Sequence, residues 1–501
     1  MHLRATGYNQ KTNKTMKEEH KFFINGVWVD PSSTEIIEVE NPATEEIIGT
    51  IAAGSKEDIS DAVEAAKNAF ATFGSSSKDE RIAILESIIT NYEDSSEELA
   101  AIISEEMGAP LWLSKVAQVT SGLQHFKDTL EVLKEFDFEE DGESFLIRKE
   151  PIGVIGMITP WNWPMNQMST KVASAIAAGC TMVLKPSEIS PFCGIHLAKV
   201  IEKSDLPNGV FNLVNGLGPV VGDALSTHPD VDMMHFTGST RAGIAVAQSS
   251  APTVKRVAQE LGGKSANIIL DDADLEKAVS AGVNLCFLNT GQSCNAPTRM
   301  LVHASQYDDA VKIAKAAAEA TVVGYPNEDG TKIGPISNRT QYEKVKRLID
   351  LGVEEGAKLV TGGSELPDGF EKGFFVKPTI FSDVTNDMTI AREEIFGPVL
   401  SILKYETEDE AVEIANDTPY GLAGYVQSGN PERAKQVANK IRAGQISING
   451  GRSRGPSAPF GGFKTSGNGR EHGMLGLHEC LETKAITVSY THLRAHETET
   501  N

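Results

Sequence analysis

The stretch Ile152-Gly153-Val154-Ile155-Gly156-Met157-Ile158 opens the part of the chain whose pattern decides the fold. It is short and apolar, which is typical of a strand buried on both faces of a sheet. Three similar apolar runs follow, and segments with helical spacing lie between them. The strand candidates are 152–158, 181–184, 210–214 and 233–236, and the helix candidates are 165–179, 190–204, 217–227 and 240–248. Short strands that alternate with helices predict a parallel, doubly wound sheet of the nucleotide-binding type.

The regions on either side of this series extend the pattern. On the amino-terminal side, the apolar residues around Asn25-Gly26 predict a pair of strands joined by a tight turn. A second alternating series runs from about residue 266 to 465. The further helices are expected at 56–73, 78–106, from Pro110 to about 135, and near 307–323, 339–356 and 431–442. We therefore predict an α/β fold with two doubly wound domains, one Rossmann-like for a cofactor and one catalytic.

Length, composition and charge narrow the class of protein. A chain of 501 residues is too long for a single core and predicts two or three domains. The net charge of −23, from 69 acidic and 46 basic residues, disfavours binding to nucleic acid or to an anionic membrane surface. No apolar run is long enough to span a bilayer, and the first residues do not have the pattern of a secretion signal. We expect a cytoplasmic protein.

The five cysteines are few, odd in number and widely spaced, so they do not predict a disulfide framework or a zinc site. We expect no metal. Cys294 stands apart because it lies in Asn289-Thr290-Gly291-Gln292-Ser293-Cys294-Asn295-Ala296-Pro297, among small and polar residues. Its thiol could serve as a nucleophile if a nearby base or backbone dipole lowers its pKa. A free cysteine is more often a small buried hydrophobe, and we read the other four in that way.

The nucleotide-binding glycine fingerprint GxGxxG is absent. Gly216, Gly218 and Gly222 have the spacing GxGxxxG, which alone favours a turn at the start of a helix over a phosphate cradle. The segment Phe236-Thr237-Gly238-Ser239-Thr240 is the better candidate. There an apolar strand leads into a glycine and into two residues able to cap a helix, whose first amides would face an anion. An ordinary strand-to-helix turn is the alternative.

Several of these stretches occur together in one order. They are Pro160-Trp161-Asn162-Trp163-Pro164, Phe236-Thr237-Gly238-Ser239-Thr240, Glu260-Leu261-Gly262-Gly263-Lys264, the Cys294 segment and Glu393-Glu394-Ile395-Phe396-Gly397-Pro398. In this set and order the chain resembles the aldehyde dehydrogenase family, from about residue 20 to 490. The resemblance implies oxidation of an aldehyde to its carboxylic acid with NAD(P), through a thiohemiacetal and a thioester on the cysteine that water then releases.

The resemblance also assigns three catalytic roles. Cys294 matches the nucleophile, Asn162 the donor to the oxyanion, and Glu260 the general base that activates water. Each residue type suits its task, since a carboxamide can donate to a developing negative charge and a partly buried carboxylate can have its pKa raised toward the working pH. Taken alone, Asn162 would be read as a turn residue and Glu260 as a surface glutamate.

The cofactor site that the resemblance implies has several parts. Gly238 and Ser239 match the residues that meet the phosphates, and Lys185 and Glu188 match the pair that binds the adenosine ribose. The residues that match those beside the nicotinamide end of the cofactor are Glu394, Phe396 and Trp161. A carboxylate at Glu188 can accept both ribose hydroxyls and would repel a 2′-phosphate, so we expect NAD, with NADP as the alternative. Trp161 and Trp163 are equally explained as the lining of a hydrophobic tunnel or as core residues.

The domain plan follows from the same resemblance. It gives an NAD-binding domain at 17–128 and 150–259, a catalytic domain at 260–477, and an oligomerisation element at 129–149 and 478–490. An apolar final strand needs another chain to cover its edge, which supports a homodimer or homotetramer. The tails 1–15 and 491–501 share the letters His-Leu-Arg-Ala and read as non-native or disordered.

Two other functions stay open. A family member could pass its thioester to coenzyme A, although Glu260 argues against that because such an enzyme needs no base for water. A non-catalytic nucleotide-binding relative is the second alternative, and the presence of Cys294, Glu260 and Asn162 argues against it. Arg452 and Arg454 lie where many members have an aromatic or aliphatic residue, so they either contact an anionic aldehyde or face solvent.

Overall fold

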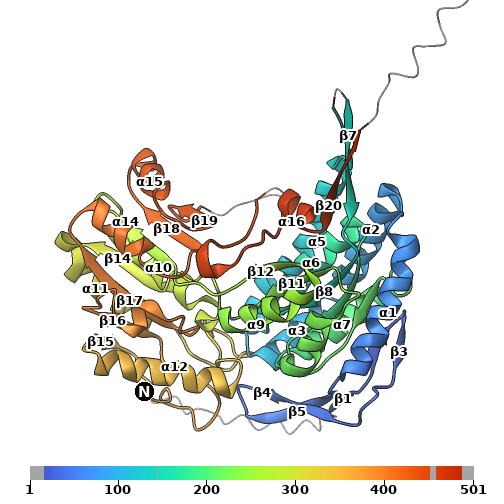
Figure 1. Ribbon diagram of the computed structural model, residues 1–501. Helices are drawn as coiled ribbons and strands as arrows, with labels where there is room; N and C mark the ends of the chain where they lie inside the picture. Colours follow the sequence, from blue (N-terminus) through green and yellow to red (C-terminus); the bar gives the residue numbers. More distant parts are fainter. Residues whose placement is uncertain (1–15, 143, 452–457, 488–501) are drawn as a thin grey trace, which may run out of the picture.

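The computed structural model describes residues 16–142, 144–451 and 458–487. It contains two seven-stranded sheets that stand side by side, each covered by helices on both faces (Figure 1). A three-stranded sheet near the amino terminus lies below them, and a second three-stranded sheet projects from the body of the molecule. The predicted α/β class with two doubly wound sheets is confirmed.

The first large sheet has the order β12-β11-β8-β9-β10-β2-β3, and its first five strands run parallel. Its strands are β2 Phe22–Ile24, β3 Val27–Val29, β8 Val154–Ile158, β9 Thr181–Lys185, β10 Phe211–Leu213, β11 Met233–Thr237 and β12 Arg256–Glu260. The predicted turn between β2 and β3 is present, because Asn25 and Gly26 both have positive φ. All four strands expected from the alternating pattern are confirmed within two residues.

Side chains of this sheet alternate between two cores. Along β8, Ile155 and Met157 belong to one buried cluster, whereas Val154 and Ile158 belong to another. The first core is covered by α2 Lys78–Asp94, α3 Ser96–Met107, α5 Thr120–Glu135, α6 Pro164–Ala178 and α7 Pro191–Glu202, and the second by α1 Lys56–Phe73, α8 Asp223–Thr227 and α9 Thr240–Ser250. Burial of both faces explains why these strands read as continuous apolar runs.

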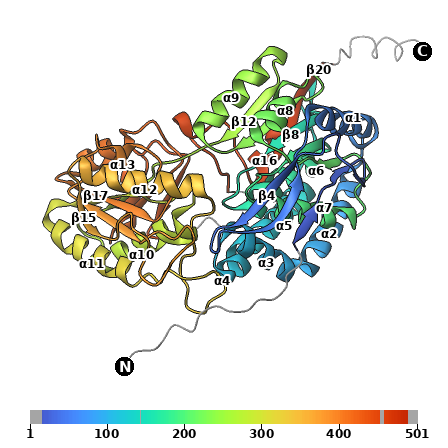
Figure 2. The same ribbon diagram turned by 90° about the horizontal axis from the view of Figure 1, so that it is seen from below.

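The second large sheet has the order β15-β16-β17-β14-β13-β18-β19, and all of its strands but β15 are parallel. Its strands are β13 Ala266–Ile269, β14 Arg299–His303, β15 Lys358–Thr361, β16 Thr379–Ser382, β17 Val399–Tyr405, β18 Ala423–Gln427 and β19 Gln445–Ile448. Its helices are α10 Leu275–Phe287, α11 Tyr307–Glu319, α12 Arg339–Glu354, α13 Thr389–Arg392, α14 Glu408–Asn416 and α15 Pro431–Ala438. Figure 2 shows this unit from below, beside the first.

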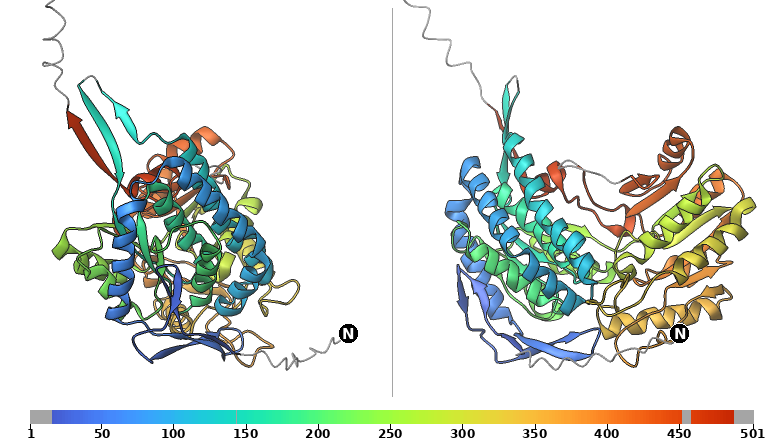
Figure 3. Two further views of the ribbon diagram at one scale, coloured as in Figure 1. Left: turned by 90° about the vertical axis from the view of Figure 1, so that its right-hand side faces the viewer. Right: turned by 180° about the vertical axis from the view of Figure 1, so that it is seen from behind.

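The small sheets connect and extend the body. The amino-terminal one has the order β1-β5-β4, with β1 Lys17–Glu19, β4 Ile36–Asn41 and β5 Glu46–Ala52. The loop after β4 reaches the second unit, where Glu45 accepts a hydrogen bond from the backbone N–H of Gly373 at 2.6 Å. The projecting sheet has the order β20-β7-β6, with β6 Glu139–Asp141, β7 Phe145–Pro151 and β20 Leu481–Thr487 (Figure 3). Helix α16 Gly473–Glu479 leads into β20.

Three expectations about local structure need correction. The single helix expected at 78–106 is two helices, because Ser95 and Ser96 bond through their hydroxyls to the carbonyl of Tyr92 and end α2. The helix after Pro110 begins as α4 Leu111–Leu113 and a π-helical segment Ser114–Val119 before α5. Helix α5 continues to Glu135, so the projecting hairpin starts later than residue 129.

Candidate active site

Four predicted site segments meet at one edge of the first sheet. Trp161 and Asn162 follow β8, Lys185 ends β9, Gly238 and Ser239 follow β11, and Glu260 ends β12. The strands are parallel, so their carboxyl ends share one edge, where ligands bind in open α/β sheets. The opposite wall comes from loops that precede strands of the second sheet, with Cys294 before β14 and with Glu394 and Phe396 before β17.

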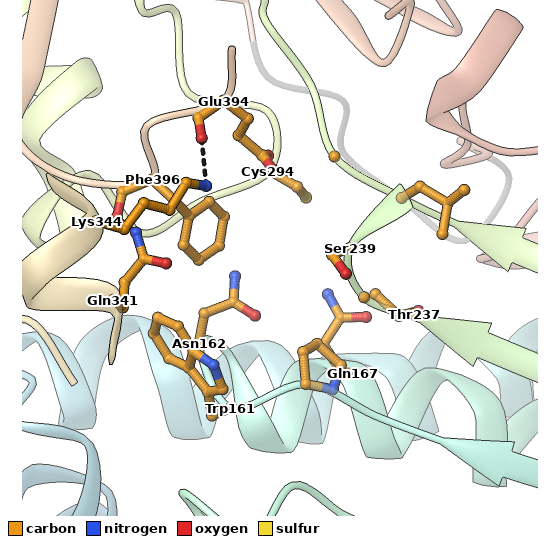
Figure 4. A pocket seen from close by; sticks show the side chains of 14 residues that line it. Trp161, Asn162, Gln167, Thr237, Ser239, Cys294, Gln341, Lys344, Glu394 and Phe396 are labelled. Carbon is orange, nitrogen blue, oxygen red and sulfur yellow. Dashed lines mark hydrogen bonds between the residues drawn. The ribbon is translucent and has the colours of Figure 1, made fainter. Parts of the chain in front are cut away.

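These two walls line a cavity with about 630 Å³ of space, part of which is open to solvent. Figure 4 shows Asn162 and Gln167 pointing into it from one side and Cys294, Glu394 and Phe396 from the other. Its lining residues are Pro160, Trp161, Asn162, Gln167, Thr237, Gly238, Ser239, Leu261, Gly262, Cys294, Gln341, Lys344, Glu394 and Phe396. Seven predicted residues therefore line one cavity, while Glu260, Lys185 and Glu188 lie outside its lining.

Cys294 is partly buried, and its four fellow cysteines are fully buried; all five are free. Burial, followed by the carboxylates of Glu394 and Glu260, raises the pKa of the Cys294 thiol to about 12. The expected condition for a thiolate, a lowered pKa, is thus not met by the fold itself. The thiol needs a base to take its proton when it attacks.

Asn162 is 3% exposed, and hydrogen bonds hold both its carboxamide and its main chain in place. Its Nδ2 donates to the backbone oxygen of Gln292 at 2.9 Å. Its own backbone oxygen accepts from Nδ2 of Asn289 at 2.9 Å and from Nε2 of Gln118 at 3.0 Å. A carboxamide nitrogen carries two hydrogens, and no described residue accepts the second one, so it can donate toward the cavity.

Glu260 ends β12 with its side chain only 2% exposed. Neither carboxylate oxygen has a hydrogen-bond partner among the described residues. Burial, and next the nearby carboxylate of Glu471, raise the pKa of Glu260 well above its usual value. Gly461 lies so close that a Cβ there would stand 2.8 Å from Oε1 of Glu260, so only a glycine leaves room for this carboxylate. A buried carboxyl without partners is a strong candidate for proton transfer.

A buried ion pair behind Glu260 was not predicted from the sequence. Lys171 on α6 pairs with Glu471 and also donates to Oγ1 of Thr237 at 2.6 Å. Nε2 of His235 lies 3.0 Å from the same oxygen of Glu471. Although burial works in the other direction, these two neighbours lower the pKa of Glu471. The one sequence signal was a single charged residue, Lys171, in an otherwise uncharged helix, since 300 residues separate the paired side chains.

The cofactor side of the cavity is built at a helix start. Ser239 caps α9 by accepting from the backbone N–H of Ala242 at 3.3 Å, which leaves the first amides of the helix without intrahelical partners. A Cβ on Gly238 would meet the ring of Phe236 at 2.6 Å, so a larger residue does not fit. These amides and the positive end of the helix dipole suit an anion such as a pyrophosphate.

Two further pairs flank this region. Nζ of Lys185 donates to Oε2 of Glu188 at 2.9 Å, and the Glu188 side chain remains 31% exposed. Oε1 of Glu394 accepts from the backbone N–H of Gly263 at 3.0 Å, while the backbone oxygen of Glu394 accepts from Lys344 at 2.6 Å. Phe396 has a positive φ of 61° and its ring meets that of Trp161 edge to face, with centroids 5.5 Å apart. Trp161 is therefore a wall of this cavity beside Phe396.

The remaining expectations concern a metal site, a membrane-spanning helix, the glycines with GxGxxxG spacing and two arginines. Within the described residues there is no group of three or more His, Cys, Asp or Glu side chains able to hold a metal ion. No helix in the described ranges is long and apolar enough to cross a membrane. Gly218 and Gly222 begin and end a π-helical turn that leads into α8, and Gly216 lies two residues before it. Arg452 and Arg454 lie outside the described residues.

The model of the aldehyde dehydrogenase family matches residues 28–486. The chain belongs to the aldehyde dehydrogenase family. It is 54% identical over 472 residues to 3-succinoylsemialdehyde-pyridine dehydrogenase of a Pseudomonas species, a match that covers 94% of this chain and 99% of the relative. The motifs predicted this family and an enzyme that oxidises aldehydes, and both predictions are confirmed.

Solved structures of other aldehyde dehydrogenases superpose on this one. An aldehyde dehydrogenase C mutant from Pseudomonas syringae, in complex with NAD⁺ and octanal, is 50% identical with a TM-score of 0.92 and covers 93% of this chain and 96% of its own. The enzyme from Bartonella henselae is 49% identical with a TM-score of 0.93, covering 95% and 100%. Betaine aldehyde dehydrogenase of Staphylococcus aureus, in complex with NAD⁺, is 36% identical with a TM-score of 0.91, covering 93% and 94%.

Proposed function

We propose that this aldehyde dehydrogenase oxidises an aldehyde to the carboxylic acid with NAD, through a thioester on Cys294 that water hydrolyses. The observation that carries the proposal is the convergence of three groups in one place. The Asn162 amide and Cys294 line one cavity, and the unpartnered carboxylate of Glu260 is close enough to raise the pKa of the Cys294 thiol. These are the donor, the nucleophile and the base that the reaction requires.

The residues act in the following order. Cys294, which is partly exposed, passes its proton to solvent, and its sulfur forms a bond to the aldehyde carbon. The resulting thiohemiacetal has an oxyanion that accepts hydrogen bonds from Asn162 and from the backbone N–H of Cys294. Bound at this site, NAD would supply the acceptor for the hydride of this carbon, and Cys294 would then carry the thioester. Glu260 then takes a proton from water, the hydroxyl attacks the thioester, and the acid leaves as the C–S bond breaks.

The residues at the sheet edge fit NAD. The start of α9, with Gly238 and Ser239, offers free amides for the pyrophosphate. Glu188 has an exposed carboxylate that can accept the ribose hydroxyls, and Lys185 holds it in place. Glu394, Phe396 and Trp161 surround the part of the cavity next to Cys294, where the nicotinamide would lie. The NAD⁺ complexes of related enzymes support the same cofactor, and NADP is the alternative.

We propose that the two large sheets belong to two domains with different functions. Residues 17–128 and 150–259 would form the NAD-binding domain and 260–477 the catalytic domain. The projecting sheet of β6, β7 and β20 would join subunits, since β20 pairs with β7 and leaves its other edge without a partner strand among the described residues. We propose a homodimer or homotetramer in the cytoplasm, where five free cysteines are stable, and light scattering of the purified protein would measure its size.

The test is a panel of aldehydes with NAD, followed by NADH absorbance and by analysis of the product. The panel contains octanal, betaine aldehyde and a pyridyl keto-aldehyde. Octanal is bound in the Pseudomonas syringae structure, and the other two correspond to the aldehydes after which two of the related enzymes are named. Formation of NADH together with free acid supports the proposal. Formation of an acyl-coenzyme A only when coenzyme A is added would favour the acylating alternative. Absence of turnover with every aldehyde, despite NAD binding, would contradict the proposal.

A further inference from the structure

The π-helical segment Ser114–Val119 carries a buried glutamine that the mechanism above does not use. Gln118 is 0% exposed although it is a polar residue in an apolar layer. A π-helical turn inserts one extra residue into a helix and frequently occurs at functional sites, where it changes the direction of a side chain. Here the changed direction brings Gln118 to two asparagines of the active site.

Gln118 uses both hydrogens of its carboxamide. Its Nε2 donates to the backbone oxygen of Asn162 at 3.0 Å and to Oδ1 of Asn289 at 3.2 Å. Its Oε1 has no hydrogen-bond partner among the described residues. The same nitrogen also lies 3.5 Å from the sulfur of Met107, a weaker acceptor. The side chain therefore acts only as a donor, and its two oxygen acceptors belong to segments that reach the cavity.

Asn289 connects this contact to the orientation of the Asn162 side chain. It is 1% exposed and has a positive φ of 55°, a conformation that non-glycine residues adopt at a cost. Its Nδ2 donates to the backbone oxygens of Asn162 at 2.9 Å and of Gln292 at 3.3 Å. The same Gln292 oxygen accepts from Nδ2 of Asn162 at 2.9 Å. One connected network of hydrogen bonds therefore holds both the main chain and the side-chain amide of Asn162.

We propose that Gln118 is a positioning residue for the oxyanion donor. By fixing the main chain of Asn162 and the side chain of Asn289, it sets the direction in which the remaining N–H of Asn162 points into the cavity. The role would be exerted through Asn162 alone, because Gln118 does not itself line the cavity. The inference rests on the proposed function and adds a residue from a distant helix to it.

The test replaces Gln118 with methionine, which has a similar length and no donor. The measurement is the pre-steady-state burst of NADH at saturating aldehyde, which reports acylation of Cys294. We expect the burst rate to fall by about tenfold, because a small misplacement of a reacting group costs up to about a hundredfold. The KM for aldehyde should change by less than about twofold, since the oxyanion direction affects the transition state more than ground-state binding. Deacylation should slow as well, because attack of water on the thioester forms an oxyanion at the same place.

The matched control is Ser114→Ala, which lies in the same π-helical segment, is equally buried, and has a hydroxyl without a partner among the described residues. It should leave the burst unchanged. A second variant, Gln118→Glu, keeps the size of the side chain, and burial should keep its carboxyl protonated, so that it can donate one hydrogen and not two. It should show part of the loss and serves if Gln118→Met does not fold. Thermal unfolding and NAD binding report folding for each variant.

The double variant with Asn162→Ala separates positioning from general damage. If Gln118 acts through Asn162, Gln118→Met should reduce the burst rate no further once Asn162 is alanine. A full additional tenfold loss, or a normal burst in Gln118→Met with wild-type Asn162, would overturn the inference. Failure of the wild-type protein to oxidise any aldehyde would instead contradict the proposed function, so the two outcomes are distinguishable.

Discussion

The two large sheets contribute opposite ends of their strands to the active site. In the first sheet, Asn162, Ser239 and Glu260 come at or after the carboxyl ends of β8, β11 and β12. In the second sheet, Cys294 and Glu394 come before the amino ends of β14 and β17. Both sheets are mainly parallel and covered by helices, so the same architecture presents two chemically different edges to one cavity.

The difference matters because of the helices at each edge. Helix α9 begins directly after β11, so its positive end faces the cavity and suits the phosphates of a cofactor. Helix α10 ends at Phe287, ahead of the Cys294 segment, and α13 ends at Arg392, ahead of Glu394. The carboxyl end of a helix carries a partial negative charge and does not stabilise a thiolate. This agrees with the pKa of the Cys294 thiol, which is raised to about 12, mainly by burial. The cofactor edge binds anions, and the edge that bears the nucleophile depends on a base.

The largest effect should come from Cys294→Ala, which removes the nucleophile at the edge of the second sheet and leaves the edge of the first intact. Turnover of aldehyde should fall by about 10⁴-fold or more, because no neighbouring group can replace the nucleophile. NAD affinity, measured by calorimetry, should stay within about twofold of the wild-type value. The control is Cys286→Ala, since the Cys286 thiol is buried and touches the carbonyl of Val399, and it should keep turnover. Lost NAD binding in Cys294→Ala would show that the two edges are not separable.

The next effect concerns Glu260→Gln. Deacylation should slow by about 10²- to 10⁴-fold, the usual contribution of a general base, while the burst of NADH persists. Because burial and Glu471 raise the pKa of Glu260, its ionised fraction increases as pH rises through that pKa. The wild-type deacylation rate should therefore increase with pH and fall in acid, and the variant should lack this dependence. An unchanged pH profile in the variant would assign the base elsewhere.

A smaller loss is expected for Asn162→Ala. Removal of one oxyanion donor should slow acylation by about a hundredfold, which corresponds to about 3 kcal/mol of barrier. The rapid burst of NADH measures this step, and NAD affinity should be unaffected. Asn166→Ala is a matched control, because Asn166 lies close by in the first turn of α6, just after the Asn162 loop, and bonds to His125 instead. Equal losses in both variants would indicate damage to α6 and not the loss of a donor.

The smallest effect tests the cofactor edge alone. Glu188→Ala should reduce the preference for NAD over NADP by about tenfold, because the carboxylate no longer accepts the ribose hydroxyls or repels a 2′-phosphate. The measurement is kcat/KM for each cofactor with the same aldehyde. The burst rate at saturating NAD should not change, since Glu188 is not among the residues that line the cavity around Cys294. Glu202→Ala, an exposed glutamate at the end of α7, is the control.

Much of the fold was readable because its signals are local. The strands β8, β9 and β11 are apolar runs, and Asn25-Gly26 specifies the first hairpin by its positive φ. The break at Ser95 was missed because hydrophobic spacing continues across it, and only the hydroxyl bonds to Tyr92 end the helix. The π-helical turn before α5 has no sequence pattern of its own, since a single inserted residue hardly changes the periodicity.

For the site, the sequence by itself determined the contiguous motifs: Cys294 among small residues, Asn162 between two tryptophans, and glycines beside Glu260 that leave room for close approach. Only the tertiary structure decided which groups face one another. It placed Glu471 against Lys171 from 300 residues away, put Gln118 behind Asn162, and raised the pKa of Cys294 instead of lowering it. The physical reason is that burial and Coulomb interactions depend on distance in space, whereas a motif records only distance along the chain.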